Sequence, residues 1–128
     1  MRVAVHQPNY APWCGYFAKM RACDVFILQD DVQFSRGGYV NRVQIETAKG
    51  TDWLTVPVPK GSTGLLINQL RFSDPKWQEN HLRELKRSYG HAPHFAEIKA
   101  MIESIYESPG ENLAAFNMRL IRAIAAFL

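Results

Sequence analysis

Polar side chains that can transfer a proton or bind a ligand gather near the N-terminus, just after a short apolar run. The group holds an imidazole at His6, carboxamides at Gln7 and Asn9, and a phenol at Tyr10. Histidine has a reference pKa of about 6.5, so it can act as a general acid or base or donate to a phosphate. We therefore predict His6 as a catalytic residue and the other three as substrate contacts. The alternative is a histidine that caps the strand end or packs against Trp13.

Two carboxylates and an amide form a second polar group, at Asp30, Asp31 and Gln33. We predict Asp30 as the second catalytic residue, and Asp31 and Gln33 as substrate contacts. A pair of carboxylates can hold Mg²⁺ together with substrate phosphates, so Mg²⁺ is the cofactor that this pattern admits. One carboxylate could instead bind sugar hydroxyls, or both could serve as turn and capping residues. Cys14 and Cys23 lack companions at metal-ligand spacing, so we assign no metal ligands.

Two cations, Lys19 and Arg42, join the candidate set. Arginine binds phosphate through two parallel hydrogen bonds. Lys19 lies one turn into a helix that we expect to start near Trp13, and a helix N-terminus favours anions. We predict that both cations contact phosphate; the alternative for each is a surface salt bridge.

Aromatic rings accompany these groups. Tyr10, Trp13 and Tyr16 could stack on a base or a sugar ring, but packing is the commoner fate of such rings. We favour packing for Trp13 and leave Tyr10 open. We expect Trp53 and Trp77 in the core.

The elements that must position these residues begin with a β-α-β unit. Apolar runs predict strands over Arg2 to His6 and over Asp24 to Gln29, with a helix at Phe17 to Ala22 between them. Such a crossover makes the strands parallel, and a continuously apolar strand is typically covered on both faces. The carboxyl ends of both strands then meet at one edge of the sheet, which brings His6 towards Asp30.

A hairpin and a helical region follow. Strands are predicted at residues 42–47 and 52–58, around a Lys49-Gly50 turn, with another strand at residues 65–72. Three helices come next. The first follows Ser73 to Pro75 and ends at Gly90, the second spans about His94 to Tyr106, and the third opens with a capping box at residues 108–111. Asn117 falls on the apolar stripe of the third, where we expect it to pin the helix. The predicted class is α/β.

Composition bounds the class of protein. A chain of 128 residues fits a single domain, residues 1–128, and 47% apolar residues is ordinary for a globular protein. A net charge of +3 suits an anionic small molecule, while the scattered lysines and arginines argue against a nucleic-acid partner. No apolar run could span a bilayer and no signal sequence is visible, so we predict a cytoplasmic protein.

The last helix is apolar and uncapped. We therefore expect the N-terminal part of a longer protein, or a helix that packs on a partner chain such as a second copy.

Several motifs recur together in one known family. They are His6-Gln7-Pro8-Asn9-Tyr10, Pro12-Trp13, Gly15-Tyr16-Phe17, Asp30-Asp31-Val32-Gln33-Phe34, Asn41-Arg42 and Trp53-Leu54-Thr55-Val56-Pro57-Val58. In these motifs the chain resembles the WbqC-like protein family. The resemblance adds Asn41 to the predicted substrate contacts. It also implies a further α/β portion beyond these residues and a role in O-antigen or other surface-polysaccharide biosynthesis.

The chain departs from the family pattern at two places. Cys14 stands where an aliphatic residue is common, so we do not expect it to be a nucleophile. Gly37-Gly38 replaces a bulkier and more basic stretch, which weakens the case for anion binding by that loop.

Two hypotheses about function remain open. The first is a transferase that acts on a nucleotide-activated or phosphorylated sugar precursor. The alternative is a non-catalytic module that binds a sugar or a partner protein in a polysaccharide assembly pathway. A third hypothesis, single-stranded nucleic-acid binding, would require a continuous basic groove.

Overall fold

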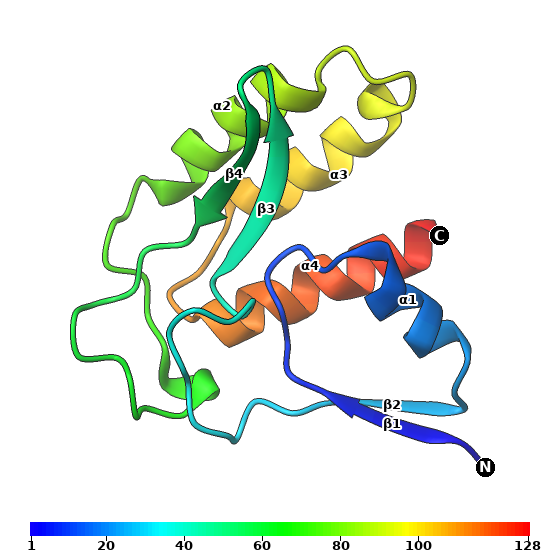
Figure 1. Ribbon diagram of the computed structural model, residues 1–128, viewed down its shortest axis with the longest axis vertical. Helices are drawn as coiled ribbons and strands as arrows, with labels where there is room; N and C mark the ends of the chain where they lie inside the picture. The colour runs from blue at the N-terminus through cyan, green and yellow to red at the C-terminus, as the bar shows by residue number, and fades with distance from the viewer.

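Residues 1–128 form two small sheets and four α-helices in the computed structural model (Figure 1). The strands are β1 (Val3–His6), β2 (Val25–Leu28), β3 (Arg42–Thr47) and β4 (Gly50–Thr55). The helices are α1 (Cys14–Arg21), α2 (Trp77–Tyr89), α3 (Phe95–Glu107) and α4 (Leu113–Phe127), with a 3₁₀ turn, η1, at Ile67–Gln69. The predicted α/β class is confirmed, with a parallel start, a hairpin and a helical C-terminal part. No helix combines the length and the apolar character that crossing a membrane requires.

The β-α-β start is also confirmed. β1 and β2 are parallel neighbours, with Val3 opposite Val25 and His6 opposite Leu28. The connecting helix, α1, begins at Cys14, which agrees with the expected start near Trp13 and lies three residues before the predicted segment Phe17 to Ala22.

One face of this sheet is covered and the other is open. Phe26 and Leu28 pack against a small cluster that α1 and α4 build around Ile121. Figure 1 shows both helices on the same side of the sheet and no element on the other. Four aliphatic side chains on that other face keep 43–51% of their surface exposed; they are Val3, Val5, Val25 and Ile27. The prediction that β2 is covered on both faces is therefore wrong, because this chain supplies only one covering layer.

The hairpin is antiparallel and shorter than predicted in its second strand. β4 begins at Gly50, whose φ of 106° is a conformation that favours glycine, and it ends at Thr55. Two residues later Pro57 lacks the N–H that a ladder needs, which is the expected reason for an early end.

The strand predicted at residues 65–72 is wrong. The segment holds η1 and makes only two isolated bridges, Gln33 with Leu66 and Arg71 with Asn112. The side chain of Gln69 accepts a hydrogen bond from the backbone N–H of Leu66 at 2.9 Å. Gln69 N also donates to Leu66 O at 2.9 Å, which closes the turn of η1 and bends the chain away from an extended path after a single bridge.

The three C-terminal helices carry most of the core. α2 ends just before Gly90 and α3 matches its prediction within one residue at each end. Trp77, at the start of α2, is 2% exposed and touches the rings of Phe72, Tyr106 and Phe116, so its predicted core position is confirmed.

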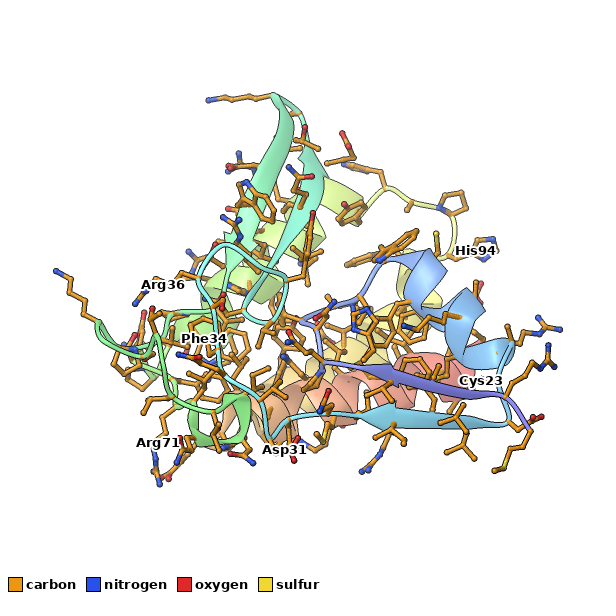
Figure 2. All side chains as sticks on the ribbon, turned by 60° about the horizontal axis from the view of Figure 1, so that its bottom comes forward. Cys23, Asp31, Phe34, Arg36, Arg71 and His94 are labelled. Carbon is orange, nitrogen blue, oxygen red and sulfur yellow. The ribbon has the colours of Figure 1, made fainter.

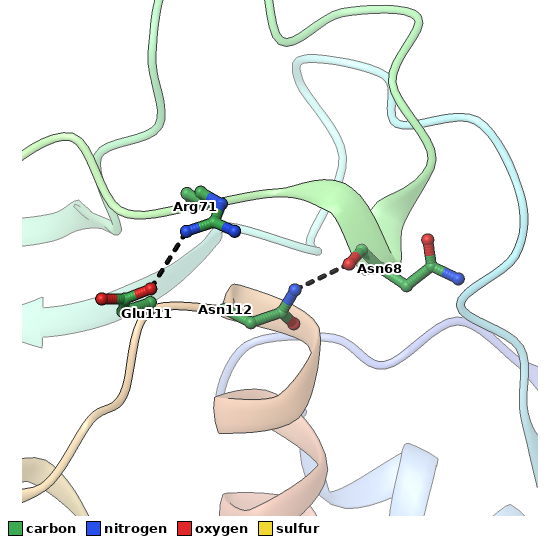
Figure 3. Close-up of polar contacts among 4 residues, drawn as sticks. All are labelled: Asn68, Arg71, Glu111 and Asn112. Carbon is green, nitrogen blue, oxygen red and sulfur yellow. Dashed lines mark hydrogen bonds and ion pairs between the residues drawn. The ribbon is translucent and has the colours of Figure 1, made fainter.

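The start of α4 differs from the prediction. The helix begins at Leu113, and Asn112 caps it by accepting a hydrogen bond from Ala115 N at 2.9 Å. The Asn112 side chain also donates to Asn68 O at 2.6 Å, beside an ion pair between Arg71 and Glu111 (Figure 3). An asparagine cap tied to η1 therefore replaces the capping box expected at residues 108–111.

Candidate functional site

A cleft of about 480 Å³ lies between the chain after β1 and the start of β3. Its volume falls within the ~300–1,000 Å³ that is common for ligand pockets. The lining combines aromatic rings, amides and small apolar groups, contributed by Asn9, Tyr10, Ala11, Pro12, Trp13, Tyr39, Val43 and Gln44. Five consecutive residues of the segment from His6 to Tyr16, residues 9–13, thus form one wall of the cleft.

A buried amide on α4 fixes the two walls relative to each other. Asn117 is fully buried, and its Nδ2 donates to Pro8 O and to Val40 O at 2.8 Å each. Tyr10 N donates to Tyr39 O at 2.9 Å, which joins the walls directly. Asn117 was expected to pin its own helix; in the structure it pins the cleft to that helix.

A chain of buried hydrogen bonds runs behind the cleft. His81 Nε2 lies 3.0 Å from the carbonyl oxygen of Thr55, so this nitrogen must carry a proton and donate. Burial lowers the pKa of His81 to about 4, so the ring is neutral and its Nδ1 accepts. Tyr10 OH, 2.8 Å away, therefore donates to Nδ1, and the hydroxyl of Tyr106 donates to Tyr10. Burial raises the pKa of both phenols.

This network limits what Tyr10 can do. Tyr10 lines the cleft, but it is 1% exposed and its hydroxyl already has two partners in the core. Its substrate-binding role stays a prediction. The structure gives it a supporting role in the cleft wall, and neither His81 nor Tyr106 was foreseen as its partner.

The exposed rings around the cleft come from other residues. Trp13 is 69% exposed, Tyr39 52% and Trp53 37%. The expectations of packing for Trp13 and of a core position for Trp53 are therefore wrong. Gly15 accounts for the position of the Trp13 ring, because a Cβ at residue 15 would lie 2.1 Å from two atoms of that ring. The indole folds back over the first turn of α1, in space that only glycine leaves free.

Arg42 and Trp53 form a flat shelf next to Tyr39. The guanidinium lies 3.8 Å from the centroid of the Trp53 ring, and that ring lies 5.9 Å from the Tyr39 ring. Arg42 Nε donates to Gly38 O at 3.2 Å and Nη2 to Gly37 O at 2.6 Å. No carboxylate pairs with Arg42, so Nη1 keeps its donors for a ligand.

The sequence held unused signals for this shelf. Gln44 pairs with Trp53 across the hairpin, and strand alternation puts both on the face opposite the buried Leu54. Gly37 and Gly38 replace a more basic stretch of the family pattern, which weakened the case for anion binding by this loop. In the structure their backbone carbonyls accept the hydrogen bonds that hold Arg42.

His6 lies outside the cleft lining. Its ring packs 4.7 Å from that of Tyr16, and its Nδ1 lies 3.2 Å from Gln7 O, to which Tyr16 OH also donates at 2.9 Å. Burial raises the pKa of Tyr16 to about 12, so its hydroxyl stays protonated. His6 is half-buried and Gln7 is exposed. The imidazole thus has an aromatic neighbour, though not Trp13.

The backbones of His6 and Asp30 converge, but their side chains do not bond. Gln29 N donates to His6 O at 2.8 Å, so the strands stay paired until the residue before Asp30. The structure has no hydrogen bond or ion pair between the imidazole and the Asp30 carboxylate. Asp31 is exposed where the chain leaves β2 (Figure 2).

The remaining predicted contacts are scattered. Lys19 Nζ donates to Val5 O at 3.4 Å, Gln33 is exposed, and Asn41 is buried and donates to Val56 O at 3.1 Å. No group of three or more His, Cys, Asp or Glu side chains is close enough to hold a metal ion. A Mg²⁺ site at Asp30 and Asp31 would therefore need ligands from the substrate.

Comparison with known proteins places the chain in a family. The family model described as the WbqC-like protein family matches residues 7–128. An uncharacterized protein of Mycobacterium tuberculosis, Rv1507c, is 40% identical over 129 residues, which cover 99% of this chain and 56% of that protein. No solved structure matches. The chain spans little more than half the length of this relative, and it belongs to the WbqC-like protein family.

Proposed function

We propose that the cleft binds a nucleotide-activated or phosphorylated sugar, and that the protein serves as a transferase in surface-polysaccharide (O-antigen) biosynthesis. The observation that supports this proposal is that exposed aromatic rings lie beside an arginine, Arg42, that has free hydrogen-bond donors. Trp13 and Tyr39 offer faces for a sugar or base ring, and Arg42 offers Nη1 to a phosphate. Asn9 and Gln44 bring amides that can bond to sugar hydroxyls.

The proposed reaction moves the sugar to an acceptor hydroxyl. The hydroxyl oxygen forms a bond to the anomeric carbon as the bond from that carbon to the phosphate oxygen breaks, and the phosphate or nucleotide leaves with the electron pair. His6 takes the proton of the attacking hydroxyl. Because His6 lies outside the cleft lining, the acceptor would approach from the carboxyl end of β1, where Asp30 could orient it.

Tryptophan fluorescence can test the binding step. The chain has three tryptophans: Trp77 is buried, Trp13 lines the cleft, and Trp53 is exposed beside the Tyr39 ring of the cleft lining. Titration with a panel of nucleotide sugars and Mg²⁺ should quench emission, and Trp13→Phe and Trp53→Phe should each remove part of the response. If no compound of the panel changes the emission of the parent protein, the proposal is contradicted.

A second candidate function follows from the same lining. Among the cleft residues there is no Asp, Glu, His, Cys or Lys, so the cavity can bind a neutral ring without acid–base groups. A non-catalytic sugar-binding or partner-binding module fits this feature. In cells that depend on the protein, His6→Ala and Asp30→Ala would abolish surface polysaccharide if it is a transferase and leave it unchanged if it is a module. Arg42→Ala should reduce it in both cases.

A further inference from the structure

The open face of the β1–β2 sheet is a continuous apolar patch. Val3 lies opposite Val25 and Val5 opposite Ile27, so the four side chains are cross-strand neighbours on one surface. They are 51%, 43%, 48% and 46% exposed, and Met1 beside them is 97% exposed. No charged residue interrupts the outward positions of the two strands.

A parallel sheet of this kind is unusual on its own. Parallel strands occur almost entirely in sheets with both faces covered, and isolated two-stranded sheets are marginal in water. Here α1 and α4 cover one face only, through Phe26 and Leu28. The second face lacks the layer that such sheets normally carry, and each strand keeps one unpaired edge.

We infer that this face, defined by Val3, Val5, Val25 and Ile27, is the docking surface for the polypeptide that corresponds to the rest of the mycobacterial relative. The matched residues make up only 56% of that protein, so its remainder is large enough to supply further strands and a covering helix. Packing of a linked segment needs no large area, because it avoids the cost of bringing two molecules together.

Two other occupants fit the patch less well. A symmetric dimer through this face would use about five side chains from each copy, far below the roughly 20–30 residues a side of a stable interface. A membrane surface would call for basic residues among the apolar ones, and the outward positions of β1 and β2 have none.

The first test mixes this chain with the remainder of the mycobacterial relative, produced as a separate polypeptide. Sedimentation should show a 1:1 complex, and titration calorimetry should show that Ile27→Glu weakens it at least tenfold. Leu65→Glu is the matched control, because Leu65 is similarly exposed, at 42%, but lies far along the chain in a loop, and it should leave binding unchanged. Self-association of this chain that Ile27→Glu abolishes would overturn the inference in favour of a second copy.

A second test decides the case in which the separate polypeptide does not fold, or in which the cost of association keeps the two unlinked parts from forming a complex. The two parts are joined in one chain, in a background where Cys14 and Cys23 are serine. The alkylation rate of Ile27→Cys is then compared with that in residues 1–128 alone. At least tenfold protection is expected in the joined chain, with no change for Leu65→Cys. Equal rates for Ile27→Cys in both chains would overturn the inference. Neither test involves the proposed sugar ligand, so each can fail without affecting the proposed function.

Discussion

Two pairs of strands present opposite kinds of surface to the solvent. The outward face of the β3–β4 hairpin carries Arg42, Gln44 and Trp53, whereas the outward face of the β1–β2 sheet is purely aliphatic. Behind the hairpin the walls of the cleft are tied by buried hydrogen bonds; behind the sheet there is only apolar packing on α1 and α4. The difference separates a surface suited to a soluble, polar ligand from one suited to another polypeptide.

The cleft side should depend most strongly on Asn117. Asn117→Ala removes two hydrogen bonds and leaves the carbonyls of Pro8 and Val40 buried without a partner. Since each unsatisfied group costs about 1–3 kcal/mol, the free energy of unfolding should fall by about 4 kcal/mol in urea denaturation. Asn80→Ala, on the exposed side of α2, should change it by less than about 0.5 kcal/mol. Equal effects would show that the cleft is not held from α4.

Acid should weaken the same side through His81. Its pKa is lowered to about 4 in the folded state from about 6.5 unfolded, so the unfolded chain binds more protons between these values. Stability is therefore fully present above pH 6.5 and is lost as the pH falls towards 4, by about 3 kcal/mol. Unfolding measured at pH 7 and pH 4 should show this loss. His81→Gln should reduce it, while the exposed His91→Gln should not. A loss unchanged in His81→Gln would contradict the assignment.

Gly15 should control binding rather than folding. Gly15→Ala puts a methyl group where the Trp13 ring lies, so the indole must move. The nucleotide sugar that quenches the tryptophan emission of the parent protein should bind about tenfold more weakly to this variant, and the emission of Trp13 should shift. Gly38→Ala is the matched control, because the nearest atom to its new methyl is 3.8 Å away. If both variants bind equally well, Trp13 is not part of the ligand surface.

Arg42→Lys should have a smaller effect. Lysine keeps the charge but loses the planar group that lies on Trp53 and bonds to Gly37 and Gly38. We expect affinity to fall about fivefold in the same titration. Arg36→Lys, at an exposed arginine in the loop before β3, should leave affinity unchanged; an equal loss there would mean that only net charge matters.

The smallest effect belongs to the open sheet face. In residues 1–128 alone, Ile27→Ser should change the free energy of unfolding by less than about 0.5 kcal/mol, because the side chain has little packing to lose. Phe26→Ala, one residue away on the covered face, should cost more. A large loss for Ile27→Ser would show that the two faces do not differ as the exposures indicate.

The sequence could predict elements whose cause is local. Apolar runs located β1 and β2, and periodic apolar residues located α2 and α3 to within a few residues. An apolar run cannot tell whether a second covering layer exists, which is why the open face of β2 was missed. The capping pattern also predicted the wrong start for α4, because Asn112 caps this helix and the segment at residues 108–111 precedes it.

Only part of the candidate site was predictable from the sequence: of the residues that line the cleft, the predicted contacts include Asn9 and Tyr10 but not Tyr39 or Gln44. Asn9 and Arg42 lie at or beside the cleft, but His6 and Asp30 lie outside it. The sequence does not decide between stacking and packing for Tyr10, and the partners that hold its hydroxyl, His81 and Tyr106, are 71 and 96 residues away in sequence. No local pattern encodes such contacts; they depend on how the helices pack.

The hydrogen bonds of Asn117 also set the order in which the molecule can be assembled. They span 109 and 77 residues, so their closure must await the synthesis of α4. During translation the segment after β1 emerges long before the residue that fixes it, and contacts of such long range are slow to form. A nascent chain that has not reached Asn117 holds every residue of the cleft wall without the wall itself. Ligand capture is therefore expected only after nearly all of residues 1–128 have left the ribosome.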